Sequence, residues 1–168
     1  MPHSTSQRSP LSLVFAGILI LFAGLSAVSP AHAADVKVVY HADFADPRRF
    51  SAMLTSINNM ATYYQNDLIE YDIRIVFVAH GVRFVTDDPL TGTPFAEDAA
   101  MAERRANNAG RLQALQEVQG VKLELCDLTR SQIGLAEDRL YPGVMLTPSG
   151  VVRIAELQDE GYAYLKIE

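Results

Sequence analysis

Short apolar runs alternate with longer segments of helical periodicity from Val36 to Ile167. The strand-like runs cover residues 36–40, 73–79, 121–125, 144–147 and 162–167, and the helical segments cover residues 47–66, 96–118, 127–135 and 149–160. Such alternation is typical of α/β proteins, in which right-handed crossovers connect parallel strands and helices cover both faces of the sheet. The sequence therefore predicts an α/β fold with a mostly parallel, five-stranded sheet.

The first long helix has the clearest signals. Asp46 is a suitable N-cap and Pro47 suits the first helical position. Apolar residues then recur at spacings of three and four, at Phe50, Met53, Leu54, Ile57, Met60, Ala61 and Tyr64. In the second long helix Gly110 permits a break, and Gly120 supplies a left-handed stop.

Residues 1–33 have the pattern of a secretory signal peptide. Arg8 precedes an apolar run from Leu13 to Leu25, and Ala31-His32-Ala33 fits a cleavage site. We therefore expect a signal peptide at residues 1–33 and a mature domain at residues 34–168, in the periplasm or secreted.

The alternative for this segment is an uncleaved membrane anchor. The span between Arg8 and Asp35 carries no formal charge and is long enough to cross the hydrocarbon core of a bilayer. Pro30 and the Ala-His-Ala motif favour cleavage, so we expect no membrane association of the mature protein.

The composition excludes several classes of protein. The chain of 168 residues is 49% hydrophobic and 20% charged, which is ordinary for one globular domain. One cysteine allows neither an intrachain disulfide nor a cysteine-rich zinc site. A net charge of -6 argues against a nucleic-acid partner, because neutralising phosphates requires a surplus of Lys and Arg.

Three side chains with reactive potential lie at the ends of predicted strands: His41, His80 and Cys126. Ligands of open parallel sheets bind beyond the carboxyl ends of the strands, so these residues mark a candidate site. The other two histidines, His3 and His32, belong to the segment that signal cleavage removes.

Cys126 is the strongest candidate of the three. It ends a predicted strand and precedes a short helix, so backbone N–H groups and the positive helix end favour its thiolate. Asp127 opposes this effect if its carboxylate turns toward the sulfur. The alternative is a buried structural cysteine, because cysteine is among the most frequently buried residues.

The histidines are less specific signals. His80 is either a general base, a donor to an anionic ligand or a turn residue, and Gly81 after it relieves backbone strain. His41 and Asp43 resemble a metal pair but also suit turn and capping roles. The sequence contains no G-x-G-x-x-G, P-loop, G-x-S-x-G or H-E-x-x-H motif, so dinucleotide, nucleotide and standard hydrolase functions lack support.

Together these residues resemble the DsrE/DsrF-like family across residues 36–167. The matching segments are Asp46-Pro47, Val78-Ala79-His80-Gly81, Cys126-Asp127-Leu128-Thr129, Tyr141-Pro142-Gly143-Val144, Pro148-Ser149-Gly150-Val151 and Leu157-Gln158-Asp159-Glu160-Gly161-Tyr162-Ala163-Tyr164. The C-terminal segments are the most specific, because the Pro-Ser-Gly cap and the Gln-x-x-Gly-Tyr-Ala-Tyr ending occur in register. The resemblance implies a three-layer, Rossmann-like α/β/α sandwich and a homo-oligomer, typically a trimer or hexamer.

The resemblance also implies site residues. Cys126 matches the cysteine that carries sulfane sulfur as a persulfide, His80 and Gly81 match the loop after the second strand, and Asn59 matches an asparagine of the first helix. Two features depart from the family pattern: Leu128 stands where many relatives have a polar residue, and residues 86–120 form a longer region than usual.

Two functional hypotheses follow. In the first, Cys126 is the reactive centre of a sulfur carrier, and His80, Gly81, Asn59 and His41 surround the substrate, without a cofactor or metal and with a sulfur donor or acceptor protein as partner. Such a protein resembles a sulfurtransferase in its chemistry rather than a turnover enzyme. In the second, the protein is an oligomeric scaffold or a small-ligand or metal-binding protein, with Cys126, His80 and His41 as a soft ligand set for copper or zinc.

Overall fold

The computed structural model describes Met1, His3 and residues 34–168, so the predicted signal peptide lies almost wholly outside the described residues. The elements in chain order are β1 (Val36–Ala42), α1 (Pro47–Asn66), β2 (Tyr71–Phe77), the 3-10 helix η1 (Ala79–Phe84), α2 (Ala99–Gln119), β3 (Lys122–Cys126), α3 (Asp127–Gln132), the 3-10 helix η2 (Glu137–Arg139), β4 (Val144–Thr147), α4 (Gly150–Asp159) and β5 (Ala163–Leu165). None of the helices described is long and apolar enough to cross a membrane.

The five strands form one sheet in the order β4-β3-β2-β1-β5. Every pairing is parallel, with Val38 opposite Ile73 and Leu125 opposite Leu146. Parallel strands that are covered on both faces are expected to be apolar throughout, and β2 shows this in its buried residues Ile75, Val76 and Phe77. The predicted five-stranded sheet is confirmed.

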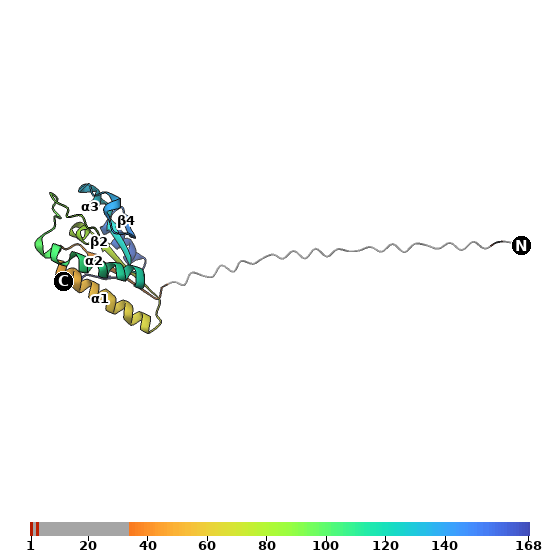
Figure 1. Cartoon of the computed structure of the whole chain (residues 1–168). Helices are drawn as coiled ribbons and strands as arrows, with labels where there is room; N and C mark the ends of the chain where they lie inside the picture. The colour runs from red at the N-terminus through yellow and green to blue at the C-terminus, as the bar shows by residue number, and fades with distance from the viewer. Residues whose placement is uncertain (2, 4–33) are drawn as a thin grey trace. The chain divides into compact units, whose positions relative to one another are not determined.

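Helices cover both faces of the sheet. The long helices α1 and α2 lie side by side on one face (Figure 1). Their apolar stripes pack on alternate strand residues, including Tyr40, Ile75 and Leu123. Helix α4 covers the other face, where Ile154 and Leu157 pack with Val39, Val76 and Tyr162. This is the three-layer, Rossmann-like α/β/α sandwich.

The chain changes faces after β4. Up to that point each connection leads to the next strand along the sheet, and Ile133, Leu135 and Leu140 of the β3–β4 connection still pack in the core under α1 and α2. The connection after β4 instead forms α4 on the opposite face and returns to β5 beside β1. The connections therefore diverge at the carboxyl ends of β3 and β4, and ligands of α/β sheets bind at such switch points.

Several boundaries differ from those predicted. Strand β1 continues to Ala42, so His41 belongs to the strand. Helix α2 begins at Ala99 because the Asp98 side chain accepts the N–H of Met101, and it continues unbroken through Gly110. Strand β5 contains only three residues, because Tyr162 instead packs against α4.

Gly81 allows η1 to pack closely against the end of β1. A Cβ atom at this position would lie 2.1 Å from the carbonyl oxygen of Ala42 and 3.3 Å from the Cβ atom of Phe77. The contact with Ala42 involves backbone, which a side-chain rotation cannot relieve. The glycine is therefore required by packing.

We predict that Gly81→Ala destabilises the fold by about 1–3 kcal/mol, because the added methyl group forces η1 away from β1. Gly110→Ala is the matched control: a Cβ atom there has nothing within 4 Å, and alanine is favoured over glycine in a helix. The control should gain about 0.5–1 kcal/mol. Urea unfolding midpoints compare both with wild type, and equal midpoints for the two variants would contradict the packing argument.

Candidate functional site

Cys126 lies at the carboxyl end of β3, beside Thr147 of β4 and at the switch point of the sheet. It is 4% exposed and occupies the N-cap position of α3. An N-cap side chain is placed to accept hydrogen bonds from the N–H groups two and three residues later. In α3 these groups belong to Leu128 and Thr129, and the Cys126 side chain makes no capping hydrogen bond to them. The fold does place the cysteine at the end of a strand and the start of a short helix, as the sequence predicts.

The first turn of α4 lies against the same cysteine. A Cβ atom on Gly150 would lie 3.0 Å from the Cβ atom of Cys126 and 2.6 Å from a methyl carbon of Val78. Only glycine allows α4 to begin this close to β2 and β3. The sulfur is thereby placed between the amino-terminal ends of two helices, each of which carries partial positive charge.

The hydrogen-bond donors around the sulfur lower the pKa of the Cys126 thiol by more than its burial raises it. Burial raises the pKa of the Cys126 thiol, but the N–H groups of Gly150, Thr129 and Leu128 and the hydroxyl of Thr129 lower it, and the net shift is downward. Donors that bond to the charged form of a group stabilise that form. The arrangement therefore favours a thiolate, which is the nucleophilic form of cysteine.

Asp127 does not counteract this effect by turning toward the sulfur. Its carboxylate accepts a hydrogen bond from Nε of Arg130 at 2.7 Å and lies 2.6 Å from a second guanidinium nitrogen. Arg130 also donates to the carbonyl of Leu135. The charge of Asp127 is thus paired within α3.

A buried ion-pair network holds α4 against the sheet. It is centred on Glu124 of β3, two residues before Cys126. Glu124 is 4% exposed, and its two carboxylate oxygens accept hydrogen bonds from Arg74 of β2 and Arg153 of α4, both at 2.8 Å. Glu124 and Cys126 project from the same face of β3, because side chains alternate along a strand. This network was not predicted from the sequence, although Glu124 stands between two leucines of a predicted strand.

His80 lies in η1 and its ring packs edge-on against Phe95, with 5.1 Å between the ring centroids. The register of β2 and β3 places Phe77 opposite Leu125, so the segment leading into η1 runs beside Cys126. The N–H of Ala79, the residue before His80, donates to Thr129 Oγ1 at 3.1 Å. The loop of His80 is therefore connected to the surroundings of the sulfur. Gly81 follows within the packed part of this loop.

His41 lies at the same edge of the sheet but apart from Cys126. Strand β2 separates their strands, which places them roughly 10 Å apart across the sheet. Nδ1 of His41 is 3.0 Å from the hydroxyl of Tyr164, and its Nε2 is 3.8 Å from Asp43. Burial lowers the pKa of His41, although the carboxylate of Asp43 acts in the opposite direction.

The soft metal-ligand set is not assembled. Within the part of the chain that the structure describes, no three His, Cys, Asp or Glu side chains converge in a way that could hold a metal ion. His41 contacts β5 and His80 contacts Phe95, so neither joins Cys126 in a common ligand shell. His41, His80 and Cys126 do lie at the carboxyl edge of the sheet, as expected, but they are spread along that edge.

Asn59 lies outside this region. It is exposed on α1, twelve residues beyond Pro47. At 1.5 Å per residue it is about 18 Å along the helix from the edge that carries Cys126. Within one chain the structure therefore does not bring Asn59 and Cys126 together, because the helix runs back toward the opposite edge of the sheet. The expected role of Asn59 beside the substrate stays a prediction.

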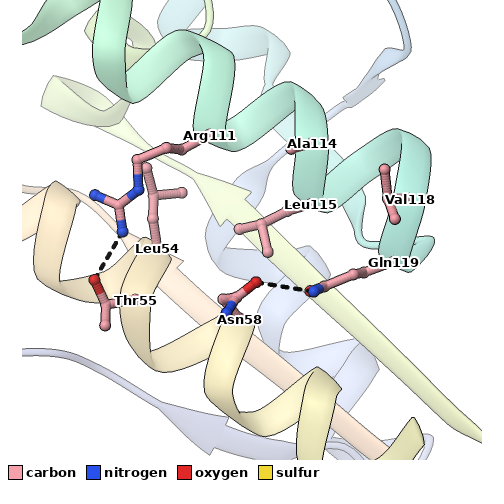
Figure 2. Close-up of a pocket in the computed structure, with 8 residues that line it drawn as sticks. All are labelled: Leu54, Thr55, Asn58, Arg111, Ala114, Leu115, Val118 and Gln119. Atoms are coloured by element: carbon pink, nitrogen blue, oxygen red, sulfur yellow. Dashed lines mark hydrogen bonds between the residues drawn. The ribbon is translucent and has the colours of Figure 1, made fainter.

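A groove of about 420 Å³ lies between α1 and α2, on the face of the sheet away from α4. Figure 2 shows Arg111 reaching Thr55 and Gln119 reaching Asn58 across it, at 2.7 and 2.9 Å. These hydrogen bonds join the two helices. The residues that line the groove include no cysteine, histidine or carboxylate, so it offers no nucleophile or general base.

Comparisons with known proteins agree with the fold. The DsrE/DsrF-like family matches residues 1–167. A structure from Methanobacterium thermoautotrophicum, described as the protein of unknown function MTH1491, is 27% identical, with a TM-score of 0.60 over 79% of this chain and 99% of that chain. The ychN protein from E. coli is 18% identical, with a TM-score of 0.47 over 78% of this chain and 98% of that one. No curated protein matches the chain.

We predict that the Cys126 thiol of the folded chain ionises at lower pH than the same thiol in the unfolded chain. Ultraviolet absorbance of the thiolate measures this, taken as the difference from Cys126→Ser so that the seven tyrosines cancel, with guanidinium-unfolded protein as the reference. Because the folded pKa is lowered, the free energy of unfolding relative to Cys126→Ser should rise with pH between the folded and unfolded pKa values, and stay at its full value above the latter. A folded thiol that ionises at higher pH than the unfolded one would show that burial dominates.

Proposed function

The chain belongs to the DsrE/DsrF-like family, and we propose that it is an exported, thiol-based carrier of sulfane sulfur in which Cys126 holds the sulfur as a persulfide. One observation carries the proposal: N–H groups from two helices lower the pKa of a thiol that its burial alone would raise. A structural cysteine needs no such donors. A nucleophilic cysteine does, because its thiolate is the reacting species.

The proposed reaction transfers a sulfur atom without net oxidation or reduction. The Cys126 thiolate attacks the sulfane sulfur of a hydropersulfide or polysulfide, an S–S bond forms at Sγ, and the S–S bond of the donor breaks. The donor leaves as a thiolate or a shorter polysulfide. A downstream thiolate then attacks the outer sulfur, and Sγ leaves as the Cys126 thiolate.

The same donors favour both steps. They stabilise the thiolate that attacks, and they stabilise it again when Sγ becomes the leaving group, because a thiol of lower pKa leaves faster. The 4% exposure of Cys126 favours a small, anionic sulfur donor over a bulky one. His80, on the neighbouring loop, assists by hydrogen bonding or proton transfer.

The partners and the location are part of the proposal. Export is supported by the signal-like pattern of residues 1–33. Self-association is supported by exposed apolar side chains on the elements around Cys126: Leu128, Met145, Val151 and Val152. A trimer or hexamer is the assembly that the family resemblance implies. A sulfur donor or acceptor protein would then meet the carrier at the carboxyl edge of the sheet.

The second candidate is an oligomeric scaffold in which Cys126 is a bystander. The burial of the cysteine favours it, since buried cysteines are usually unreactive. A metal-binding form of this candidate is less favoured, because the reactive side chains described at the rim do not converge.

We predict that the folded wild-type protein gains mass in steps of roughly 32 Da, one sulfur atom each, on incubation with polysulfide, and that a reductant reverses the gain. Cys126→Ser should keep the fold and the oligomer but gain no mass, because a hydroxyl is not ionised at neutral pH. His80→Ala should load more slowly without loss of the oligomer. Intact and native mass spectrometry measure these outcomes.

The unfolded wild-type chain is the control for access to the thiol. Loading of the unfolded chain without loading of the folded one would favour the scaffold. Loss of solubility in Cys126→Ser would instead assign the cysteine a structural role.

We further predict that the exported protein begins at or near Ala34, because the cleavage motif ends at Ala33. Intact-mass analysis of the protein from the soluble extracytoplasmic fraction measures the start directly. A mass that retains residues 1–33, found in the membrane fraction, would establish the uncleaved anchor.

A further inference from the structure

A cleft of about 410 Å³ lies between α2 and the segment that leads into β4; we call it the α2 cleft. Its floor contains Leu112 and Leu123, each 1% exposed, so it reaches down to the core beneath α1 and α2. Cys126 projects from the opposite face of β3, because side chains alternate along a strand. The α2 cleft is therefore separate from the candidate site around the thiol.

The wall that α2 contributes is made of small residues, Ala106, Ala109 and Gly110. Glycine in the interior of a helix is less favourable than alanine. Packing does not require Gly110, because a Cβ atom there would have nothing within 4 Å, whereas one on Gly81 would overlap its neighbours. Gly110 therefore lowers the stability of α2 and keeps the cleft open.

The opposite wall is fixed by the fold. The N–H of Tyr141 donates to the carbonyl of Val85 at 2.9 Å. Gly143 follows with a φ angle of 79°, and a Cβ atom there would overlap the side-chain amide of Gln116. The segment before β4 and α2 thus touch at this end of the cleft. The cleft is preformed, as sites for small molecules usually are, and its volume falls within their range of roughly 300–1,000 Å³.

The cleft has one charged group, the carboxylate of Asp87, which lies exposed at its rim. The Tyr141 hydroxyl donates to Oδ1 of Asp87 at 2.7 Å. Burial and the neighbouring carboxylate raise the pKa of Tyr141, so its hydroxyl keeps its proton at neutral pH. Arg105 lies near that hydroxyl but is paired with Glu97 at 2.8 Å. Among the described residues, Asp87 forms no ion pair and can accept one from a ligand.

We propose that the α2 cleft binds a small amphiphilic amine, with the apolar or aromatic part of the ligand against Ala106, Ala109 and Gly110 and its protonated nitrogen at Asp87. The ring of Tyr141 adds an aromatic face beside the positive charge. This inference goes beyond the proposed function and does not rest on it, because the thiol lies on the other face of the sheet.

The charge of the cleft selects against two other kinds of ligand. An anion would meet the carboxylate of Asp87, and no cationic side chain lines the cleft in the described part of the chain. A divalent cation needs several oxygen ligands, and the cleft offers one carboxylate. An apolar body with a single positive nitrogen satisfies both the small apolar wall and the carboxylate.

The test is a titration of the full folded chain with phenethylamine, followed by two-dimensional NMR of the isotope-labelled protein. The backbone amides of Ala106, Ala109 and Gly110 should shift and saturate together. Hydrocinnamate, which has the same body and the opposite charge, should cause no saturable shift at the same concentrations. Phenethyl alcohol, the neutral analogue, should bind more weakly than the amine.

Asp87→Asn removes the charge and keeps an oxygen that can accept the Tyr141 hydroxyl. It should weaken phenethylamine binding by about tenfold or more and leave the binding of phenethyl alcohol unchanged, because hydrogen bonds to charged groups are the stronger ones. Glu103→Gln is the matched control, since it makes the same change at an exposed position of α2 outside the cleft. It should bind the amine as wild type does.

Gly110→Leu fills the cleft, and the open space around residue 110 allows the fold to accept it. The folded variant should bind neither the amine nor the alcohol. Ala106→Leu is the second filling variant, used if the first does not fold, and circular dichroism establishes the fold of each.

Three results would overturn the proposal. The first is the absence of a saturable shift at the cleft with phenethylamine. The second is equal binding of hydrocinnamate or an unchanged affinity in Asp87→Asn, either of which would show that the carboxylate does not recognise the ligand. The third is wild-type affinity in a folded filling variant, which would place the amine elsewhere. Sulfur uptake by Cys126 is measured separately, so failure of either proposal leaves the other standing.

Discussion

The close approach of α4 to Cys126 is the contact on which the candidate site depends. Helix α4 reaches Cys126 because the chain changes faces of the sheet after β4. Gly150 permits the close approach, since a Cβ atom there would lie only 2.6 Å from a methyl carbon of Val78. The connection leaving β3 stays on the other face. Two helix N-termini therefore meet at one strand end, and the sulfur of Cys126 lies between them. Without the change of faces, the first turn of α4 would not reach the thiol.

The approach of α4 also brings charges into the interior. Glu124 bonds to Arg74 and Arg153, and Arg153 continues to Glu160 near the end of the same helix at 3.1 Å. A buried ion pair of this kind adds little net stability, but the loss of one partner leaves an uncompensated charge. The network therefore penalises any displacement of α4 from the sheet. It complements the packing of Gly150, so the first half of α4 is fixed relative to β3 by two separate contacts.

Local signals were sufficient for the elements but not for the site. Asp46 and Pro47 begin α1 as their types predict, and Gly120, with a φ angle of 67°, ends α2. The surroundings of Cys126 depend on contacts with Gly150, far along the chain, and on the strand order, which periodicity does not reveal. For the same reason His41 was expected beside the cysteine, whereas β2 separates their strands. Thr129 belongs to the Cys126–Thr129 segment that resembles the family. The partner of its hydroxyl, the N–H of Ala79, lies far along the chain and follows only from the fold.

The central claim is that the folded site makes Cys126 a thiolate that both takes up and releases sulfur. Release is the most direct test, because uptake alone also occurs on exposed thiols. The folded protein is loaded with radiolabelled polysulfide, freed of excess reagent and exposed to cyanide, which accepts sulfane sulfur as thiocyanate. The account predicts labelled thiocyanate in an amount equal to the sulfur loaded on the protein, with the free thiol regenerated and the fold intact. Label that stays on the folded protein and is released only after unfolding would contradict it.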